Sequence, residues 1–555
     1  MLFLQSICME IKSKIILLIV ACLAFGLFSN LYTLELRAEE PRRAATAIEM
    51  YLTKDYVVPH LNSYNYYNKP PLFSWVLSFF FSLFGSFDEW VVRLPSLLSF
   101  VLTALVHFLI SKKHIGFEAA LLSSLFFLSS ADLLFYGSLN SGEIDLFYCL
   151  VSYIQVISLF SYFHKNNSWL LILSYLAASV GFLTKGFPAI AYQGFGLLAL
   201  CIQTKKWENL VKPVHFIAIC CFTIPVVTYY YLYYLREGTT VVSYIIRLFE
   251  ESSQRTGFGS RLHKIGINLV NFPIKLVRFL FPWSLLFLLV WKRSVWINLF
   301  SNSFLKFACL FLACNMPLYW LSGETKSRYL YLFYILILSV LAYHYLNHPE
   351  RSKFQKSFEI SGFIILGCMT VAPLFLNFIP NLNAIPHLFL KTTLAICGFA
   401  SILYGYSLTN AFKIYYLILS MAFFRIALNV FYLPAIPQIE SRLFRPTISE
   451  ILQITKSEPI HLYGKSNKIH TNLFLGKLEL TNSKLETAPL LPYQIPYYIT
   501  KANKHIMQFD SVLKDQTFYI GHKYDFRDQP IQIYFRFYDF WLKDSLYLAK
   551  LNKPN

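Results

Sequence analysis

The sequence predicts an all-α polytopic membrane protein of about thirteen transmembrane helices, followed by a small extracytoplasmic α/β domain. Three observations predict this fold class. Of the 555 residues, 56% are hydrophobic and only 14% are charged, and the mean hydropathy of +0.48 is too high for a soluble protein. Apolar runs of membrane-spanning length recur from residue 15 to residue 433, and from residue 436 the chain becomes polar and mixed in charge.

Thirteen apolar stretches are long enough to cross a bilayer, which takes about 17–25 residues of helix. They are 15–31, 91–110, 117–138, 144–163, 169–183, 188–202, 214–235, 276–291, 304–321, 329–345, 360–378, 387–408 and 414–433. The run 71–84 is shorter and begins with a proline that another proline precedes, so we expect an interfacial helix there. Counting it as a span would reverse the side assigned to every later loop.

Positive charges in the short loops orient the chain, because cytoplasmic loops carry an excess of Lys and Arg. With the N-terminus in the cytoplasm, every loop on that side is basic: Lys112-Lys113, Lys165, Lys205-Lys206, Lys292-Arg293, the segment 351–356 and Lys413. An odd number of spans then places the tail on the opposite side, together with the first loop, 32–90. Topology therefore explains the net charge of +19, and nucleic acid is not expected as a partner.

The tail alternates short apolar runs, such as 460–463 and 518–520, with helix-like stretches, which predicts a small α/β domain. It contains no cysteine, no phosphate-binding glycine loop and no nucleophile motif. We therefore divide the chain into a membrane domain, 1–435, and a C-terminal domain, 436–555.

The first outer loop carries paired acids and paired bases directly after the first span: Glu39-Glu40 and Arg42-Arg43. A solvated loop face with local ion pairs is the simpler explanation for such charges. Ionisable groups at membrane depth are nevertheless candidate functional groups by default. A carboxylate there can orient an acceptor group or remove its proton, so we favour a functional site at Glu39 or Glu40.

Lys69 stands before two prolines, on a stiff and extended segment. Its ammonium group suits a lipid phosphate, although an interfacial lysine can also extend its charge toward head groups. Tyr66 and Tyr67 form either a stacking platform for a ligand or part of an interfacial aromatic belt.

Further charges from separate loops are expected on the same outer side. Asp145 lies one turn into its helix, where an unpaired acid would be costly, whereas Glu143 fits a charge at the helix start. Lys185 ends another helix. Three more cations, Arg255, Lys326 and Arg328, could approach an anionic ligand. Several acids and bases converging from separate loops indicate a site.

In this order, these positions resemble membrane glycosyltransferases that use a polyprenyl-phosphate sugar donor. The chain is most similar to the lipid A aminoarabinose transferases and the related protein O-mannosyltransferases, over about residues 15–345. The matching motifs are Glu39-Glu40-Pro41-Arg42-Arg43, Glu49-Met50, the segment 54–59, Lys69-Pro70-Pro71, Arg93-Leu94-Pro95-Ser96, Ile144-Asp145, the segment 183–186, Glu251 with Gln254-Arg255, Pro282-Trp283 and the segment 326–329.

The resemblance implies a GT-C fold and assigns roles residue by residue. The family's catalytic aspartate falls on Glu39, whose extra methylene moves the carboxylate by about 1.5 Å, so either the pocket has adjusted or Glu40 bears more of the work. Lys69 matches the lysine that meets the donor phosphate, and Asp145 matches a second acid near the site. The family's metal-holding positions are Asn68 and Ser252 here. We therefore expect no metal and no other cofactor.

The function implied is transfer of a sugar from a polyprenyl-phosphate donor to a lipid A-type or other envelope acceptor, with inversion at the anomeric carbon. Arg42, Arg255, Lys326 and Arg328 are expected to help Lys69 hold the donor phosphate. Tyr66, Tyr67 and Lys185 are expected to contact the sugar or the acceptor.

The expected location is a bacterial inner membrane, with the C-terminal domain in the periplasm. Three alternatives remain open: a protein O-glycosyltransferase of the same fold, a flippase for lipid-linked sugars, and an assembly partner whose tail binds other proteins. A flippase would favour charges within the spans and two similar halves.

Overall fold

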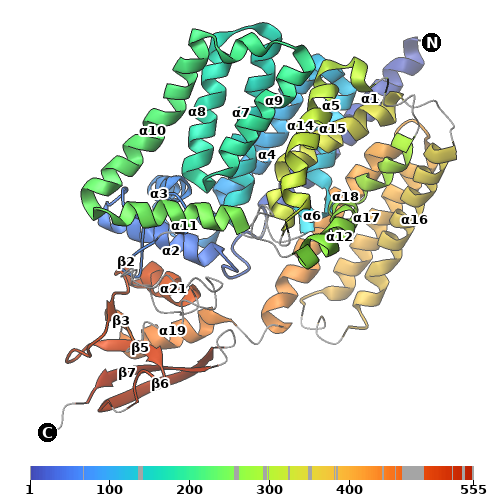
Figure 1. The fold of residues 1–555 in the computed structure, drawn as a ribbon. Helices are drawn as coiled ribbons and strands as arrows, with labels where there is room; N and C mark the ends of the chain where they lie inside the picture. Colours follow the sequence, from blue (N-terminus) through green and yellow to red (C-terminus); the bar gives the residue numbers. More distant parts are fainter. Residues whose placement is uncertain are drawn as a thin grey trace. The chain divides into compact units, whose positions relative to one another are not determined.

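The computed structural model describes residues 2–66, 68–135, 142–254, 262–291, 297, 299–322, 325–347, 353–379, 382, 385–439, 443–456, 458–464, 493–527, 529–539 and 544–552 (Figure 1). Two compact units are present, each made of three chain segments. The membrane unit contains residues 1–34, 96–228 and 245–439. The loop–tail unit contains residues 35–95, 229–244 and 440–555. The domain boundary predicted at residues 435 and 436 stays a prediction.

The described elements of the membrane unit are all helices, and α4, α10 and α11 extend from one unit into the other. They are α1 (Leu2–Phe28), α4 (Glu89–Ile115), α5 (Phe117–Ser129), α6 (Ala131–Phe135), α7 (Ile144–Lys165), α8 (Ser168–Lys185), α9 (Pro188–Thr204), η1 (Trp207–Leu210), α10 (Pro213–Glu237), α11 (Thr240–Gln254), α12 (Leu262–Phe279), η2 (Trp283–Trp291), α14 (Ser303–Trp320), η3 (Ser327–Tyr329), α15 (Tyr331–Asn347), α16 (Lys353–Leu376), α17 (Leu388–Leu408) and α18 (Lys413–Ile439).

Ten helices in the described part of the chain are long and apolar enough to cross a membrane: α1, α4, α5 with α6, α7, α8, α10, α14, α16, α17 and α18. The predicted helical membrane fold is confirmed, with fewer candidate spans than the expected thirteen. Two expected spans, α9 and α15, are helices of 17 residues each, at the lower limit of the length that crosses a bilayer, and are not among these ten. The expected span 276–291 is wrong as a single helix, because the run is divided between the end of α12 and the 3-10 helix η2.

Buried polar side chains link the helices of the membrane unit. The His107 ring on α4 lies 2.7 Å from the Tyr153 hydroxyl on α7 and 2.8 Å from the Ser123 hydroxyl on α5. The hydroxyl of Ser339 on α15 lies 3.2 Å from Nε2 of His107, the ring nitrogen that Ser123 also contacts. All four side chains are fully buried. Because a buried polar group is costly unless it is hydrogen-bonded, this network specifies how the four helices pack.

Arg425 holds the ends of two helices together inside the membrane unit. Its guanidinium donates to the carbonyl of Gly26 near the end of α1 (3.1 Å) and to that of Leu134 near the end of α6 (2.6 Å). A cation at carbonyl-bearing helix ends satisfies their orphan acceptors and complements the helix dipole. A Cβ at Gly26 would lie only 2.9 Å from Cγ of Arg425, which explains the glycine there.

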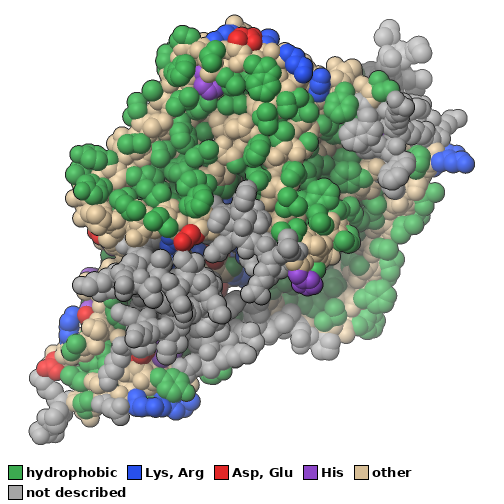
Figure 2. Space-filling view, in the orientation of Figure 1, with side chains coloured by type: hydrophobic (Ala, Val, Ile, Leu, Met, Phe, Trp, Pro, Cys, Tyr) green, Lys and Arg blue, Asp and Glu red, His purple; other side chains and the backbone are tan. Residues whose placement is uncertain are grey.

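The lipid-facing character of the helices is visible on the surface. Figure 2 shows the helical part covered mainly by hydrophobic side chains. On α10 the exposed large hydrophobics include Phe216, Ile217, Ile224 and Val227. Exposed large hydrophobic side chains in this number fit contact with lipid rather than water.

The loop–tail unit combines short helices with two sheets. Its elements are α2 (Glu40–Thr53), β1 (His60–Leu61), β2 (Tyr64–Asn65), α3 (Leu72–Phe84), α19 (Phe444–Thr455), β3 (Ile460–Tyr463), α21 (Gln494–Asn503), β4 (Phe509–Asp510), β5 (Phe518–His522), β6 (Ile531–Asp539) and β7 (Asp544–Leu551). The predicted short helix after the two prolines is thus α3. Its interfacial position stays a prediction.

The tail forms a mixed five-stranded sheet in the order β4-β3-β5-β7-β6. β3 pairs in parallel with β4 and β5, whereas β7 pairs antiparallel with β5 and β6. Tyr463, Tyr519, Phe526 and Ala549 form a buried cluster on this sheet. The small α/β domain predicted from the alternating tail is confirmed.

Candidate active site

The first turn of α2 carries the two acids that the sequence singled out. Glu39 is the N-cap residue, Glu40 begins the helix, and Pro41 occupies the first turn, where its missing N–H costs nothing. Acidic residues here complement the positive end of the helix dipole. The Glu39 side chain makes no capping hydrogen bond and instead forms an ion pair with Arg42, one turn further on. It keeps 23% of its side-chain surface exposed, whereas Arg42 keeps 8%.

Glu40 has a different environment, because its carboxylate is fully buried against Arg93 of α4. Arg93 donates from Nε to Oε1 at 2.8 Å and from Nη2 to Oε2 at 3.1 Å. The backbone N–H of Arg37 also donates to Oε2, at 3.0 Å. Arg93 in turn donates to the carbonyl of Glu35 at 3.0 Å. A carboxylate bound on both oxygens and removed from solvent is suited to hold structure rather than to exchange a proton, so the geometry favours Glu39 as the reactive carboxylate.

Arg42 lies within cation–π distance of two tyrosine rings. Its guanidinium is 5.7 Å from the ring centroid of Tyr66 and 5.5 Å from that of Tyr493, which directly precedes α21. Both rings are half-buried. Contact with aromatic rings restricts the orientation of a guanidinium, which is a side chain well suited to bind a phosphate.

A β-hairpin formed by β1 and β2 positions Tyr66 near the Arg42 guanidinium. Asn62 and Ser63 occupy its turn with φ of 55° and 66°. Both of their backbone N–H groups donate to the buried carboxylate of Glu49 on α2, that of Ser63 at 3.0 Å. Burial raises the pKa of Glu49 to about 7, although the two N–H donors oppose the rise. Glu49 is therefore a proton-sensitive support for the hairpin.

Lys69 is 9% exposed and ends the segment that follows the hairpin. Its carbonyl accepts a hydrogen bond of 2.7 Å from the hydroxyl of Tyr244. Pro70 and Pro71 come next, and Pro71 is the N-cap of α3. Ser78 of α3 donates to the carbonyl of Ala47 on α2 at 3.0 Å, which ties the two short helices together.

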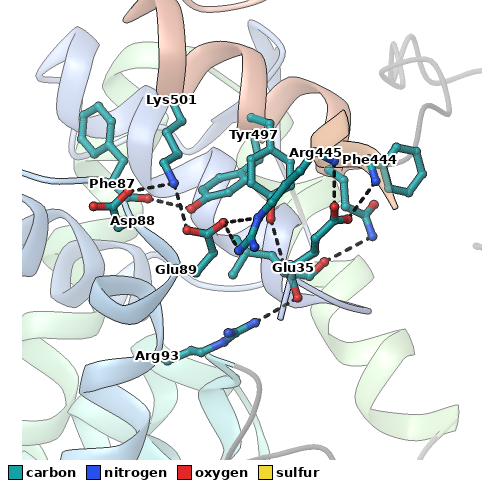
Figure 3. Close-up of polar contacts among 12 residues, drawn as sticks. Glu35, Phe87, Asp88, Glu89, Arg93, Phe444, Arg445, Tyr497 and Lys501 are labelled. Atoms are coloured by element: carbon teal, nitrogen blue, oxygen red, sulfur yellow. Dashed lines mark hydrogen bonds and ion pairs between the residues drawn. The ribbon is translucent and has the colours of Figure 1, made fainter. Parts of the chain in front are cut away.

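The tail holds the first loop through a second charged network (Figure 3). The buried carboxylate of Glu35 accepts the backbone N–H groups of Phe444 (2.9 Å) and Arg445 (2.7 Å), where α19 begins. Burial raises the pKa of Glu35 above its ordinary value, against the effect of these donors. Glu89, the first residue of α4, accepts from Arg445 (2.6 Å) and from Lys501 of α21 (2.9 Å).

Two further contacts complete this network. Lys501 pairs with Asp88 at 2.8 Å, and Tyr497 donates to the carbonyl of Phe87 at 2.6 Å. Partial burial alone would raise the pKa of Asp88, but the hydrogen bond and charge of Lys501 lower it overall. The start of α4 therefore bonds both to α2, through Arg93, and to the C-terminal domain, through Glu89.

The membrane unit holds its own cluster of two acids and two bases. Asp145, at the start of α7, pairs with Lys185 at the end of α8. Arg328 of η3 pairs with Glu143, and its Nε lies 3.7 Å from Oδ2 of Asp145. Burial alone would lower the pKa of Arg328, but the charges of Asp145 and Glu143 raise it overall. The Lys185 ammonium also lies 4.7 Å from the ring centroid of Tyr329.

The structure thus groups the predicted site residues into two sets. Glu39, Glu40, Arg42, Tyr66 and Lys69 belong to the loop–tail unit, and Asp145, Lys185 and Arg328 form the cluster in the membrane unit. Lys326 is exposed at the N-cap of η3. Tyr67 and Arg255 lie outside the described residues.

Sequence reasoning missed several members of these networks: Glu35, Glu89, Arg93, Arg445, Tyr493 and Lys501. For Arg93 a signal existed, because it opens the matched motif Arg93-Leu94-Pro95-Ser96. Glu143 stands at the N-cap of α7, as expected of a helix-start charge, and its side chain also pairs with Arg328.

Within the part of the chain that is described, no three His, Cys, Asp or Glu side chains are grouped to hold a metal ion. The expectation of a metal-free and cofactor-free site stays a prediction.

Comparisons with known proteins bear on the fold and on the sequence family. Residues 68–231 match the family of dolichyl-phosphate-mannose-protein mannosyltransferases. A crystal structure of ArnT from Cupriavidus metallidurans bound to undecaprenyl phosphate superposes with a TM-score of 0.68, covering 96% of this chain and 97% of that one at 16% identity. The chain has the ArnT fold. The resemblance and the GT-C fold expected from the sequence motifs are confirmed.

Two curated relatives show how far the sequence similarity extends. The undecaprenyl phosphate-alpha-4-amino-4-deoxy-L-arabinose arabinosyl transferase of Erwinia tasmaniensis is 32% identical over 219 residues, which is 37% of this chain and 39% of the relative. An uncharacterized protein of Aquifex aeolicus is 26% identical over 356 residues, 64% of this chain and 78% of the relative. The match to the arabinosyl transferase thus spans about two fifths of that enzyme.

Proposed function

We propose that this protein is an integral membrane glycosyltransferase that moves a sugar from a polyprenyl-phosphate donor to a lipid A-type or other envelope acceptor, with inversion. The observation that carries the proposal is the pair Glu39–Arg42 at the start of α2, a partly exposed carboxylate beside a stacked guanidinium. The matches to an arabinosyl transferase and to the ArnT fold support it.

In this mechanism an oxygen of the acceptor attacks the anomeric carbon from the side opposite the phosphate. The bond between the anomeric carbon and the phosphate oxygen breaks, and its electron pair leaves with the polyprenyl phosphate. Lys69 and Arg42 meet the charge that grows on the phosphate. Glu39 receives the proton when the acceptor is a hydroxyl.

The ion pair of Glu39 with Arg42 couples these two roles. A phosphate that binds Arg42 competes with Glu39 for the same guanidinium, so donor binding would release the carboxylate toward the acceptor. Glu40 and Arg93 keep the start of α2 in place during this exchange, because their buried pair is separate from it. The sequence supports a sugar- or phosphate-contacting role for Asp145, Lys185 and Arg328, with Lys326 and Arg255 as further phosphate ligands and Tyr67 as a further sugar or acceptor contact.

We place the reaction at the periplasmic side of a bacterial inner membrane, with the N-terminus in the cytoplasm and the C-terminal domain in the periplasm. The basic loops that alternate along the sequence support this orientation. A protein hydroxyl is the second candidate acceptor, because residues 68–231 match a protein mannosyltransferase family. A hydroxyl requires a base, whereas a lipid phosphate is already ionised near neutral pH.

The test uses purified protein in nanodiscs with labelled undecaprenyl-phosphate sugars and either lipid A or a serine-rich peptide as acceptor. Release of undecaprenyl phosphate with label on one acceptor would support the proposal and identify the acceptor class. Glu458→Gln is the matched control for acid-to-amide variants, since this half-exposed acid pairs with Lys550 in the tail. No release with any donor would contradict the proposal.

A further inference from the structure

The C-terminal domain supplies one of the two rings that flank Arg42. Tyr66 belongs to the first loop, but Tyr493 stands at the N-cap of α21, more than 400 residues further along the chain. Arg42 itself is only 7% exposed. The candidate phosphate-binding group therefore contacts one ring from the first loop and one from the tail.

Contacts along α21 define where Tyr493 lies relative to α2. Gln494 donates to the carbonyl of Leu36 at 3.3 Å, and the N–H of Leu36 donates to the hydroxyl of Tyr498 at 3.2 Å. Tyr497 and Lys501 bond to the segment just before α4 and to its first residue (Figure 3). Successive turns of one helix thus bond to both ends of the first loop, which leaves the Tyr493 ring little freedom to move away from Arg42.

We propose that Tyr493 is a positioning residue for Arg42, so that the C-terminal domain sets the orientation of the donor-phosphate site. This inference rests on the proposed function, in which Arg42 meets the phosphate. The Tyr493 ring restricts the orientation of the Arg42 guanidinium, and so the direction in which the guanidinium N–H groups face an anion. Without that ring, Arg42 keeps its ion pair with Glu39 but loses one of the two surfaces that fix its plane.

The effect is expected in affinity for the phosphate. Because Tyr493→Ala removes a cation–π contact to Arg42, it should weaken binding of undecaprenyl phosphate by about tenfold, or about 1.4 kcal/mol. Tyr493→Phe keeps the aromatic face and should bind within about twofold of wild type. Tyr524→Ala is the matched control, because Tyr524 also stacks with an arginine of the same domain, Arg527, at 5.4 Å.

A double-mutant cycle with Arg42→Ala separates positioning from general stability. If Tyr493 acts through Arg42, then Tyr493→Ala adds little to the loss that Arg42→Ala already causes. A merely structural role would weaken binding by the same factor in both backgrounds. Tyr493→Leu keeps an apolar side chain at the start of α21 and carries the test if the alanine variant does not fold.

Binding of undecaprenyl phosphate would be measured on the full-length protein in nanodiscs, together with the melting temperature of each variant. The expected result is a tenfold loss in Tyr493→Ala, none in Tyr524→Ala, and strong coupling to Arg42. Wild-type affinity in Tyr493→Ala, or equal losses in both backgrounds, would overturn the inference alone. No binding by the wild type would overturn the proposed function together with it.

Discussion

Glu40→Gln is expected to destabilise the protein strongly while slowing the proposed reaction only modestly. The Glu40 carboxylate is fully buried and accepts two hydrogen bonds from Arg93 and one from the backbone of Arg37. In the glutamine variant one oxygen becomes an NH2 group that faces the donors of Arg93. The arginine then remains as a buried charge without its counter-ion.

The size of the effect follows from this burial. Removing one partner of a buried ion pair typically costs about 3–5 kcal/mol. A domain of about 150–250 residues loses about 2–4 °C in Tm per kcal/mol, so unfolding of the loop–tail unit should shift down by roughly 6–20 °C. Glu39→Gln removes a short-range pair at a partly exposed site and should cost about 1 kcal/mol.

The assay compares thermal unfolding and turnover of Glu40→Gln, Glu39→Gln and the double variant Glu40→Leu/Arg93→Met. Replacing both charges by apolar groups removes the unpaired charge, so the double variant should melt well above Glu40→Gln. Below its Tm, Glu40→Gln should keep turnover within about tenfold of wild type. An unchanged Tm in Glu40→Gln, or a loss of turnover as deep as in Glu39→Gln without a lower Tm, would refute the structural role.

Two further predictions concern the supporting groups. The pKa of Glu49 is about 7 in the folded protein and 4.5 ordinarily. Between pH 4.5 and pH 7 the folded state therefore keeps a proton on Glu49 that the unfolded state has released. The free energy of unfolding should therefore fall by about 3 kcal/mol as the pH rises from 4.5 to 7. Glu49→Gln should abolish this part of the pH dependence in melting curves recorded from pH 4.5 to 8. An unchanged pH dependence in that variant would contradict the assignment. Arg328→Gln removes the cation that pairs with Glu143 and lies near Asp145, so kcat/KM should drop at least about tenfold, with partial recovery in Arg328→Lys; wild-type kinetics in Arg328→Gln would exclude a role for the guanidinium.

Much of the fold could be predicted from hydropathy, because bilayer thickness sets a length that an apolar run must reach. The differences in the count arise at the limits of this criterion. α9 and α15, with 17 residues each, are at its lower limit, and the run 276–291 is mainly apolar although the backbone divides it into two elements. Hydropathy records composition and cannot show where a helix breaks.

The candidate site could be predicted only in part, because polarity identifies charged residues without their partners. The resemblance assigns the catalytic position to Glu39 but leaves open how much of the work Glu40 bears, and the burial of Glu40 against Arg93 of α4 shows only in the structure. The same holds for Tyr493, whose role depends on how the tail folds back on the first loop. Long-range pairs of this kind leave no local pattern for a reader of one sequence.

The most direct test of the account is the steady-state rate of Glu39→Gln, measured with labelled undecaprenyl-phosphate sugar and a hydroxyl acceptor, beside Lys69→Ala and the control Glu458→Gln. General-base catalysis contributes about 10²–10⁴-fold, so Glu39→Gln should lower kcat by at least about a hundredfold. The KM for the donor should not rise and should fall if anything, because the phosphate no longer competes with the carboxylate for Arg42. Lys69→Ala should lower kcat and also raise the KM for the donor. Glu458→Gln should have the kcat and KM of the wild type. A Glu39→Gln variant that turns over at the wild-type rate would contradict the central claim that this carboxylate carries the chemistry.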